Sequence, residues 1–105
     1  TQQIWLLDED GAALGFYALE QQDGGAWLLD SLFVSPQRIG RGYGKQLFAH
    51  ACELAREQGA QELLIDADPH AEAFYLSRGA QRTGEIAAPV EDDAARVRPQ
   101  LRLSL

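Results

Sequence analysis

The sequence has no methionine and a single cysteine, Cys52. One thiol cannot form an intrachain disulfide, and it excludes a structural zinc site built from several cysteines. No apolar run approaches the roughly 20 residues of a membrane-spanning helix, and no signal peptide opens the chain. We therefore expect a cytoplasmic protein that holds no metal and does not engage a membrane.

Basic residues are scarce as well. Lysine and arginine together number 9 against 16 aspartates and glutamates, which gives a formal net charge of -7 and a pI of about 4.6. A chain with this charge repels a phosphate backbone at long range, so nucleic acid is not an expected partner. Three of the basic residues, Arg38, Arg41 and Lys45, nevertheless lie close together in the sequence, which leaves room for a local anion site.

The length and the apolar pattern predict one domain, residues 1–105, of the α/β class. The expected strands are 3–7, 14–19, 27–34, 62–67, 80–86 and 100–105, with a loop over 87–99. A helix is expected over 44–58, and a second one starts with Asp68 and Pro69 as N-cap and first helical residue. The order β-β-β-α-β-α-β-β predicts a mixed sheet of the α+β type with helices packed on it.

The first predicted helix has a buried and an exposed face. Apolar residues recur at helical spacing on the face expected to be buried: Leu47, Phe48, Ala51, Leu54 and Ala55. His50 falls on the opposite face, so we interpret it as a solvated side chain and not as a ligand. Cys52 is expected to be a small buried apolar residue.

Three glycines, Gly40, Gly42 and Gly44, stand at alternate positions directly before this helix. Glycine permits positive φ and a close approach of the backbone, so successive N–H groups can turn inward. The start of the helix adds unpaired N–H groups and the positive end of the helix dipole. The pattern indicates a cradle for a diphosphate, and a merely tight loop is the alternative.

The spacing fits neither of two common phosphate-binding loops. A Walker A loop would need glycine in place of Ile39 and serine or threonine in place of Gln46. A dinucleotide fingerprint that starts at Gly40 would need glycine in place of Lys45. Spacing alone therefore leaves the nature of the anion open.

The segment from Val34 to Phe48 resembles motif A of the GNAT superfamily of N-acetyltransferases. That pattern is a strand ending in Val-x-Pro, then Q/R-x-x-G-x-G/A, then a helix that begins with an apolar pair, here Leu47 and Phe48. Ile39 stands at the Gln/Arg position and departs from the pattern. The departure affects one side-chain contact and leaves the backbone cradle intact.

A second segment supports the resemblance independently. Residues 68–80 resemble the family's N-x-x-A-x-x-F-Y-x-x-x-G-F motif, with Phe74 and Tyr75 at the F-Y positions. Asp68 stands where asparagine is common, and Ala80 stands where phenylalanine is common. The two motifs occur in the family's order, and the resemblance covers roughly Leu14 to Leu105.

The resemblance implies acetyl-CoA as the cofactor, held between two strands that splay apart at the centre of the sheet. Main-chain groups of Leu32, Phe33 and Val34 would pair with the pantetheine arm, and the Val34 amide would donate to the thioester carbonyl. The residues implied for the diphosphate are Ile39, Gly40, Arg41, Gly42, Tyr43, Gly44 and Lys45. Asp68 and Phe74, in the second motif, are also implied at the cofactor.

Two residues are candidates for catalysis. Tyr75 matches the tyrosine that protonates the departing thiolate in many relatives, and the alternative is a core aromatic beside Phe74. Asp30 lies four residues before Val34, on the same face of an alternating strand, and is the candidate base; the alternative is a strand-end aspartate in solvent. His70 is a weaker candidate base. Cys52 is not expected to carry an acyl group, because the family usually transfers directly within a ternary complex.

The prediction is thus an N-acetyltransferase that moves an acetyl group to a primary amine of a small molecule or peptide by direct attack. The alternative is a non-catalytic acyl-CoA-binding module, or half of an assembled domain. A typical family member begins with one more strand and two helices. Without them the strand over 3–7 is an exposed apolar edge, which we expect either absent residues or a second copy in a homodimer to cover.

Overall fold

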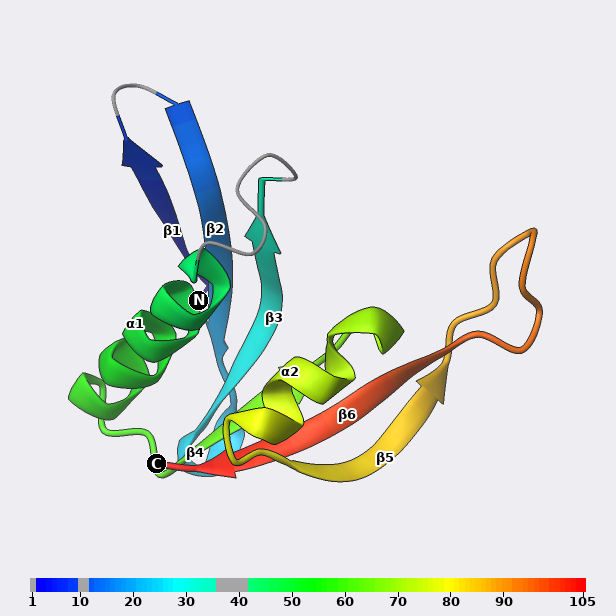
Figure 1. Cartoon of the computed structure of the whole chain (residues 1–105). Helices are drawn as coiled ribbons and strands as arrows, with labels where there is room; N and C mark the ends of the chain where they lie inside the picture. The colour runs from blue at the N-terminus through cyan, green and yellow to red at the C-terminus, as the bar shows by residue number, and fades with distance from the viewer. Residues whose placement is uncertain (1, 10–11, 36–41) are drawn as a thin grey trace.

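The computed structural model describes residues 2–9, 12–35 and 42–105, and these form a six-stranded sheet with two α-helices (Figure 1). The elements are β1 Gln2–Glu9, β2 Ala12–Gln21, β3 Ala26–Val34, α1 Tyr43–Glu57, β4 Glu62–Asp66, α2 Glu72–Ser77, β5 Gln81–Ala87 and β6 Val97–Ser104. Short 3-10 turns at Asp23–Gly25 and Pro69–Ala71 precede β3 and α2. The predicted order of strands and helices is confirmed.

The sheet is mixed, and its strands follow the order β1-β2-β3-β4-β6-β5. Strands β1, β2 and β3 are antiparallel, β3 and β4 are parallel, and β4, β6 and β5 are antiparallel. The parallel pair is joined through α1, since parallel strands need a crossover connection. β3 and β4 therefore lie at the centre, and β1 and β5 form the two edges.

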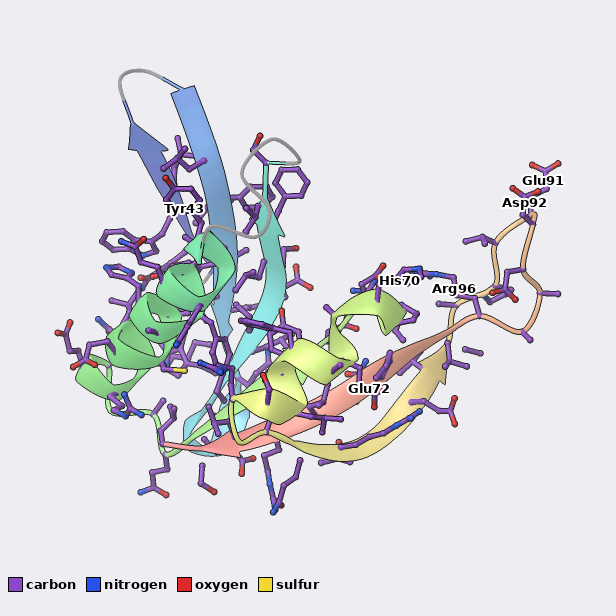
Figure 2. The ribbon with its side chains drawn as sticks, viewed as in Figure 1. Tyr43, His70, Glu72, Glu91, Asp92 and Arg96 are labelled. Atoms are coloured by element: carbon purple, nitrogen blue, oxygen red, sulfur yellow. The ribbon has the colours of Figure 1, made fainter. Side chains whose placement is uncertain are left out.

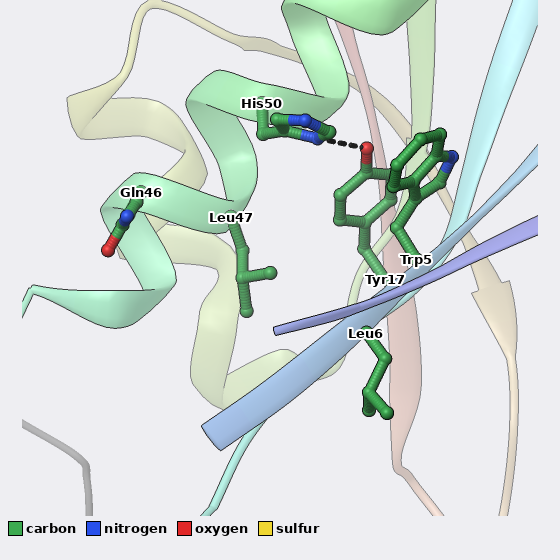
Figure 3. Close-up of a pocket in the computed structure, with 6 residues that line it drawn as sticks. All are labelled: Trp5, Leu6, Tyr17, Gln46, Leu47 and His50. Carbon is green, nitrogen blue, oxygen red and sulfur yellow. Dashed lines mark hydrogen bonds between the residues drawn. The ribbon is translucent and has the colours of Figure 1, made fainter. Parts of the chain in front are cut away.

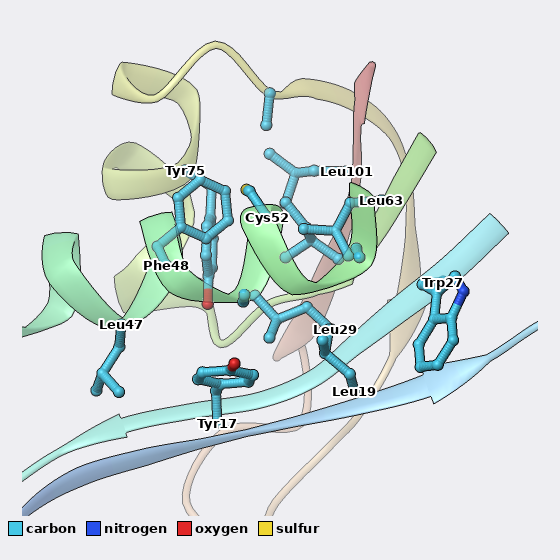
Figure 4. Packing of buried hydrophobic residues seen from close by; sticks show 14 of the residues in the cluster. Tyr17, Leu19, Trp27, Leu29, Leu47, Phe48, Cys52, Leu63, Tyr75 and Leu101 are labelled. Atoms are coloured by element: carbon cyan, nitrogen blue, oxygen red, sulfur yellow. The ribbon is translucent and has the colours of Figure 1, made fainter. Parts of the chain in front are cut away.

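Both helices pack on the same face of the sheet (Figure 1), and they enclose one core. The sheet contributes Tyr17, Leu19, Trp27, Leu29, Leu63, Ile65 and Leu101, and α1 contributes Leu47, Phe48, Ala51, Cys52 and Ala55 (Figure 4). The predicted buried face of α1 is thus confirmed, as is the burial of Cys52. No helix in the described part of the chain is long and apolar enough to cross a membrane.

The end of the predicted loop over 87–99 is wrong, because β6 already begins at Val97. Pro99 lies inside this strand, where a missing N–H would normally be costly. Here Asp66 pairs with Gln100 as the last position of the β4–β6 ladder. The Ala67 N–H then donates to the Pro99 carbonyl over 3.0 Å, so Pro99 lies just beyond the paired part of β4. The proline is tolerated because β4 does not require an N–H donor at this position of β6.

The two central strands splay apart, as the resemblance implied. Their parallel ladder runs only from Ala26 opposite Glu62 to Leu29 opposite Ile65, although β3 continues to Val34. Beyond Leu29 the end of β3 is therefore not paired with β4, and we call the opening between the two strand ends the gap.

Candidate functional site

The main chain at the end of β3 carries groups that face this gap. The Ser35 N–H donates to the Leu14 carbonyl of β2 over 2.8 Å. Main-chain groups of an extended strand alternate in direction, so those of Phe33 also lie on the β2 side. Those of Leu32 and Val34 lie on the opposite side, where the β4 ladder has ended. Of the three residues expected to pair with an extended ligand, Leu32 and Val34 present their N–H and C=O groups to the gap.

The start of α1 lies beside these groups. Gly42 is the N-cap, with a left-handed φ of 81°, and it offers no side chain to cap the helix. The first helical hydrogen bond runs from the Gln46 N–H to the Gly42 carbonyl over 3.0 Å, so the preceding amides point out of the helix end. A Cβ atom at Gly44 would lie 3.6 Å from a methyl group of Val34. The helix start and the gap are thus parts of one surface.

Part of the expected cradle is described and part is not. Lys45 is exposed and Tyr43 is half-buried at the first turn of α1. Ile39, Gly40 and Arg41 lie outside the described residues. The positive φ of Gly42 confirms that the loop enters the helix through a conformation that favours glycine.

Tyr75 of α2 is buried, with 4% of its surface exposed, and packs in an aromatic cluster. Its ring centroid lies 5.5 Å from that of Phe48 and 5.3 Å from that of Phe74. Figure 4 shows its hydroxyl directed toward the side of the core where β2 and β3 run, and no described residue forms a hydrogen bond with it. Burial raises the pKa of Tyr75 to about 12, against a smaller lowering by the charge of Arg98. Tyr75 is therefore buried in this cluster, and its phenol stays protonated in ordinary buffers.

Asp30 lies where β3 and β4 separate. The register between β2 and β3 passes from Leu19 opposite Leu29 to Ala18 opposite Ser31, which leaves Asp30 as the extra residue of a β-bulge. The core-facing residues change from odd to even across it, with Leu29 before and Leu32 after. Simple alternation therefore does not hold across Asp30, and its placement on the face of Val34 stays a prediction. Asp30 is half-buried and close enough to Arg98 for its charge to contribute to raising the arginine's pKa.

A polar cluster holds the end of β4 to β6. The Asp66 carboxylate oxygen Oδ1 accepts from Arg98 Nε over 2.8 Å and from Gln100 Nε2 over 2.9 Å. Arg98 also donates to the Asp66 carbonyl over 3.4 Å. The pKa of Arg98 is raised by the Asp66 hydrogen bond and by the nearby carboxylates, so the guanidinium stays charged.

Asp68 caps the turn that leads into α2, as predicted. Its Oδ1 accepts the His70 N–H over 2.9 Å and its Oδ2 accepts from Arg96 over 3.2 Å, and these contacts lower its pKa. Figure 2 shows His70 and Arg96 near the start of the second helix, with Glu91 and Asp92 farther out at the tip of the β5–β6 hairpin. Phe74 packs against Phe48 with the ring centroids 5.9 Å apart.

A groove of about 330 Å³ runs along α1, from Lys45 at its first turn to Arg56 near its end. Its lining includes the apolar side chains of Phe48 and Leu103, and Lys45, Arg56 and Arg78 contribute cations. Glu53, which pairs with Arg56 over 3.6 Å, is the carboxylate among its lining residues. Such a groove suits a planar apolar group that carries negative charge.

The sequence did not predict the contacts of His50. The side chain is on the exposed face, as expected, but its Nδ1 lies 2.5 Å from the Tyr17 hydroxyl, and its ring is 5.2 Å from that of Trp5. These residues, with Leu47, line a pocket of about 120 Å³ between β1 and α1 (Figure 3). Helical periodicity predicts which face of α1 carries His50, but it cannot predict that residues of β1 and β2 contact that face.

Comparison with known proteins connects this geometry to a family. The model of the acetyltransferase (GNAT) family matches residues 1–80. No curated protein matches the sequence.

Solved structures share the fold over almost the whole chain. A GCN5-related N-acetyltransferase from Rhodopseudomonas palustris is 26% identical, with a TM-score of 0.84 over 99% of this chain and 62% of that one. A GNAT family acetyltransferase from Elizabethkingia anophelis with acetyl-CoA bound is 16% identical, with a TM-score of 0.87 over 99% of this chain and 76% of that one. A Bacillus subtilis acetyltransferase in complex with CoA is 19% identical, with a TM-score of 0.86 over 99% and 77% of the two chains. This sequence therefore corresponds to 62–77% of the length of these structures.

Proposed function

Since the chain belongs to the GNAT acetyltransferase family, we propose that it transfers an acetyl group from acetyl-CoA to a primary amine. The observation that carries the proposal is the gap between β3 and β4, where Leu32 and Val34 present main-chain groups that β4 does not pair. The exposed amides at the start of α1 adjoin this gap. An extended amide-containing arm that ends in a diphosphate is complementary to both.

The cofactor contacts follow from this complementarity. Leu32 and Val34 pair with the amides of the pantetheine arm as a neighbouring strand would. The amides from Tyr43 to Lys45 receive the diphosphate, together with the loop residues Ile39, Gly40 and Arg41. The groove along α1 takes the adenosine and its phosphate, because both apolar and cationic side chains line it. Phe74 and Asp68 line the α2 side.

The reaction joins the amine nitrogen to the acetyl carbonyl carbon and breaks the carbon–sulfur bond. The Val34 N–H donates to the carbonyl oxygen, where negative charge develops. Asp30 accepts the proton that the amine loses, directly or through a water molecule. Tyr75 donates its phenolic proton to the departing thiolate. Cys52 takes no part, because it is buried and burial raises the pKa of its thiol.

We also propose that a second copy of the chain covers β1. This edge strand exposes 66% of Ile4, 42% of Trp5 and 62% of Leu6. Edge strands of this kind pair with other chains unless charge or a covering element prevents it, and a two-fold axis would let β1 pair with itself. Sedimentation equilibrium would show a dimer that Leu6→Lys weakens. A parent that stays monomeric over a wide concentration range would contradict this proposal.

The single buried thiol fits a reducing compartment, so we place the protein in the cytoplasm.

Calorimetric titration of acetyl-CoA into the parent chain and two glycine variants tests the cofactor site. Gly42→Trp puts a bulky side chain at the α1 start, where φ is 81°. Gly59→Trp is the matched control, because Gly59 has a φ of 85° at the other end of the same helix and equally open surroundings. Acetyl-CoA should bind the parent and the Gly59→Trp control, and it should not bind the Gly42→Trp variant. Saturation at 100 times Kd should stabilise the parent by about 2.7 kcal/mol.

A screen of primary amines, with release of the free thiol as the readout, then tests the transfer. A well-folded parent that does not bind acetyl-CoA would contradict the proposed function. Binding of acetyl-CoA without turnover of any amine would instead indicate that the chain is a non-catalytic acyl-CoA-binding module.

A further inference from the structure

The gap between β3 and β4 begins at two aspartates. The last paired position is Leu29 opposite Ile65, and the same register would bring Asp30 opposite Asp66. Neighbouring strands lie about 4.8 Å apart, and like charges directly opposite each other are destabilising. One more step of the ladder would therefore bring two carboxylates together.

The Asp66 side chain is held on the side of β4 away from β3, by contacts with β6. One carboxylate oxygen receives both the Arg98 Nε–H and the Gln100 side-chain amide, over 2.8 and 2.9 Å. Arg98 and Gln100 stand at alternate positions of β6, so both reach the same face of the sheet. The side chains of Arg98 and Asp66 are 33% and 25% exposed, so solvent screens this contact less than it screens a surface ion pair.

The backbones of β3 and β4 also change course where the ladder ends. After Asp66 the chain continues along β6, since the Ala67 N–H donates to the Pro99 carbonyl over 3.0 Å. On the other strand, the bulge at Asp30 bends β3, because a bulge increases local twist. Both strands therefore change at the level where the ladder ends, β4 by following β6 and β3 at its bulge.

We infer that Asp66 is a positioning residue of the cofactor site, which ends the β3–β4 ladder and keeps the gap open because Arg98 and Gln100 hold its carboxylate on β6. Only the identity of the ligand in the gap rests on the proposed function. The gap itself is a property of the free chain, so it can be tested without any cofactor.

The carboxylates around Arg98 favour its charged form. Asp66, Asp68 and Asp30 all raise the pKa of Arg98, with the Asp66 hydrogen bond first among the causes. Tyr75 also lies near it, and its pKa of about 12 leaves it neutral. Arg98 therefore remains a cation, available to hold Asp66.

Asp66→Ala in the full chain removes both the second carboxylate and the acceptor for β6. Glu62→Ala is the matched control, because Glu62 pairs with Arg102 over 3.7 Å on the same two strands, at the end where the ladder is intact. Amide hydrogen exchange followed by NMR on the free proteins gives the first readout. The Leu32 amide should exchange fast in the parent and in Glu62→Ala, and at least several-fold more slowly in Asp66→Ala as the β3–β4 ladder extends to it.

The second readout is acetyl-CoA affinity. If the gap stays open in about one molecule in ten, the apparent Kd rises about tenfold. Asp66→Asn, which loses the charge but keeps an acceptor for Gln100, should give a smaller change in the same direction and serves if Asp66→Ala does not fold. Exchange rates and Kd that match those of Glu62→Ala would overturn the inference. A parent that fails to bind acetyl-CoA would overturn the proposed function, and the exchange comparison would still decide the role of Asp66.

Discussion

The main chains of Gly15 in β2 and Phe33 in β3 lie so close together that a Cβ atom at position 15 would be 2.4 Å from the Phe33 carbonyl oxygen. The same atom would be 2.9 Å from a methyl group of Leu47 and 3.2 Å from the Val34 Cα. The Phe33 carbonyl is backbone and cannot rotate away. Glycine at position 15 thus fixes where the end of β3 runs, and with it the groups that face the gap.

Gly15→Ala should therefore destabilise the fold by about 1–3 kcal/mol, the usual cost of overpacking, and should also weaken acetyl-CoA binding by displacing Val34. Gly84→Ala is the control, because a Cβ atom there meets nothing within 4 Å. Urea unfolding of the two variants gives the comparison. Equal stability of both would show that the sheet absorbs the extra atom without strain.

Tyr75→Phe should lower kcat about 10²–10⁴-fold, the range typical of a positioned acid, and leave acetyl-CoA affinity nearly unchanged. Tyr17→Phe is the matched control, since it removes another buried phenol whose pKa is also about 12. Steady-state kinetics with any accepted amine separates them. An unchanged rate in Tyr75→Phe would mean that the residue is a core aromatic only.

Asp30→Asn should lower kcat with little change in acetyl-CoA affinity, because the amide keeps the shape of the side chain but accepts no proton from the amine. The kcat of Asp30→Asn should recover with a less basic amine acceptor, because such an amine reaches its reactive neutral form without a protein base. A rate loss that is the same for all acceptors, or a loss of cofactor binding, would point instead to a structural role at the β3 bulge.

Local patterns in the sequence accounted for most of the elements. The glycine run before Tyr43, the Asp68-Pro69 start signal and the helical spacing of Leu47 and Phe48 each act within a few residues, so they can be recognised without the fold. Element ends moved by one to three residues, as at β6, where Pro99 concealed a strand that begins at Val97. The splayed strands came from the family resemblance, because no local pattern states where a parallel ladder ends.

The remaining features depend on contacts between distant segments. The bulge at Asp30 reverses which residues of β3 face the core, and it arises from the register with β2. Asp66, Arg98 and Gln100 meet only because β4 and β6 are neighbours across more than 30 residues of chain. Alternation within one strand cannot reveal such contacts.

The fold should lose stability above pH 10 because of two buried tyrosines. Burial raises the pKa of Tyr17 and of Tyr75 from 10.0 to about 12, so the native state keeps both protons where the unfolded chain has lost them. The free energy of unfolding is then intact below pH 10 and should fall by about 1.4 kcal/mol per pH unit for each tyrosine between pH 10 and 12. Urea unfolding at pH 8, 9, 10 and 11 measures this slope, and replacing either tyrosine by phenylalanine should halve it. A parent whose stability at pH 11 equals that at pH 9 would show that these phenols ionise as readily in the folded protein as in the unfolded chain.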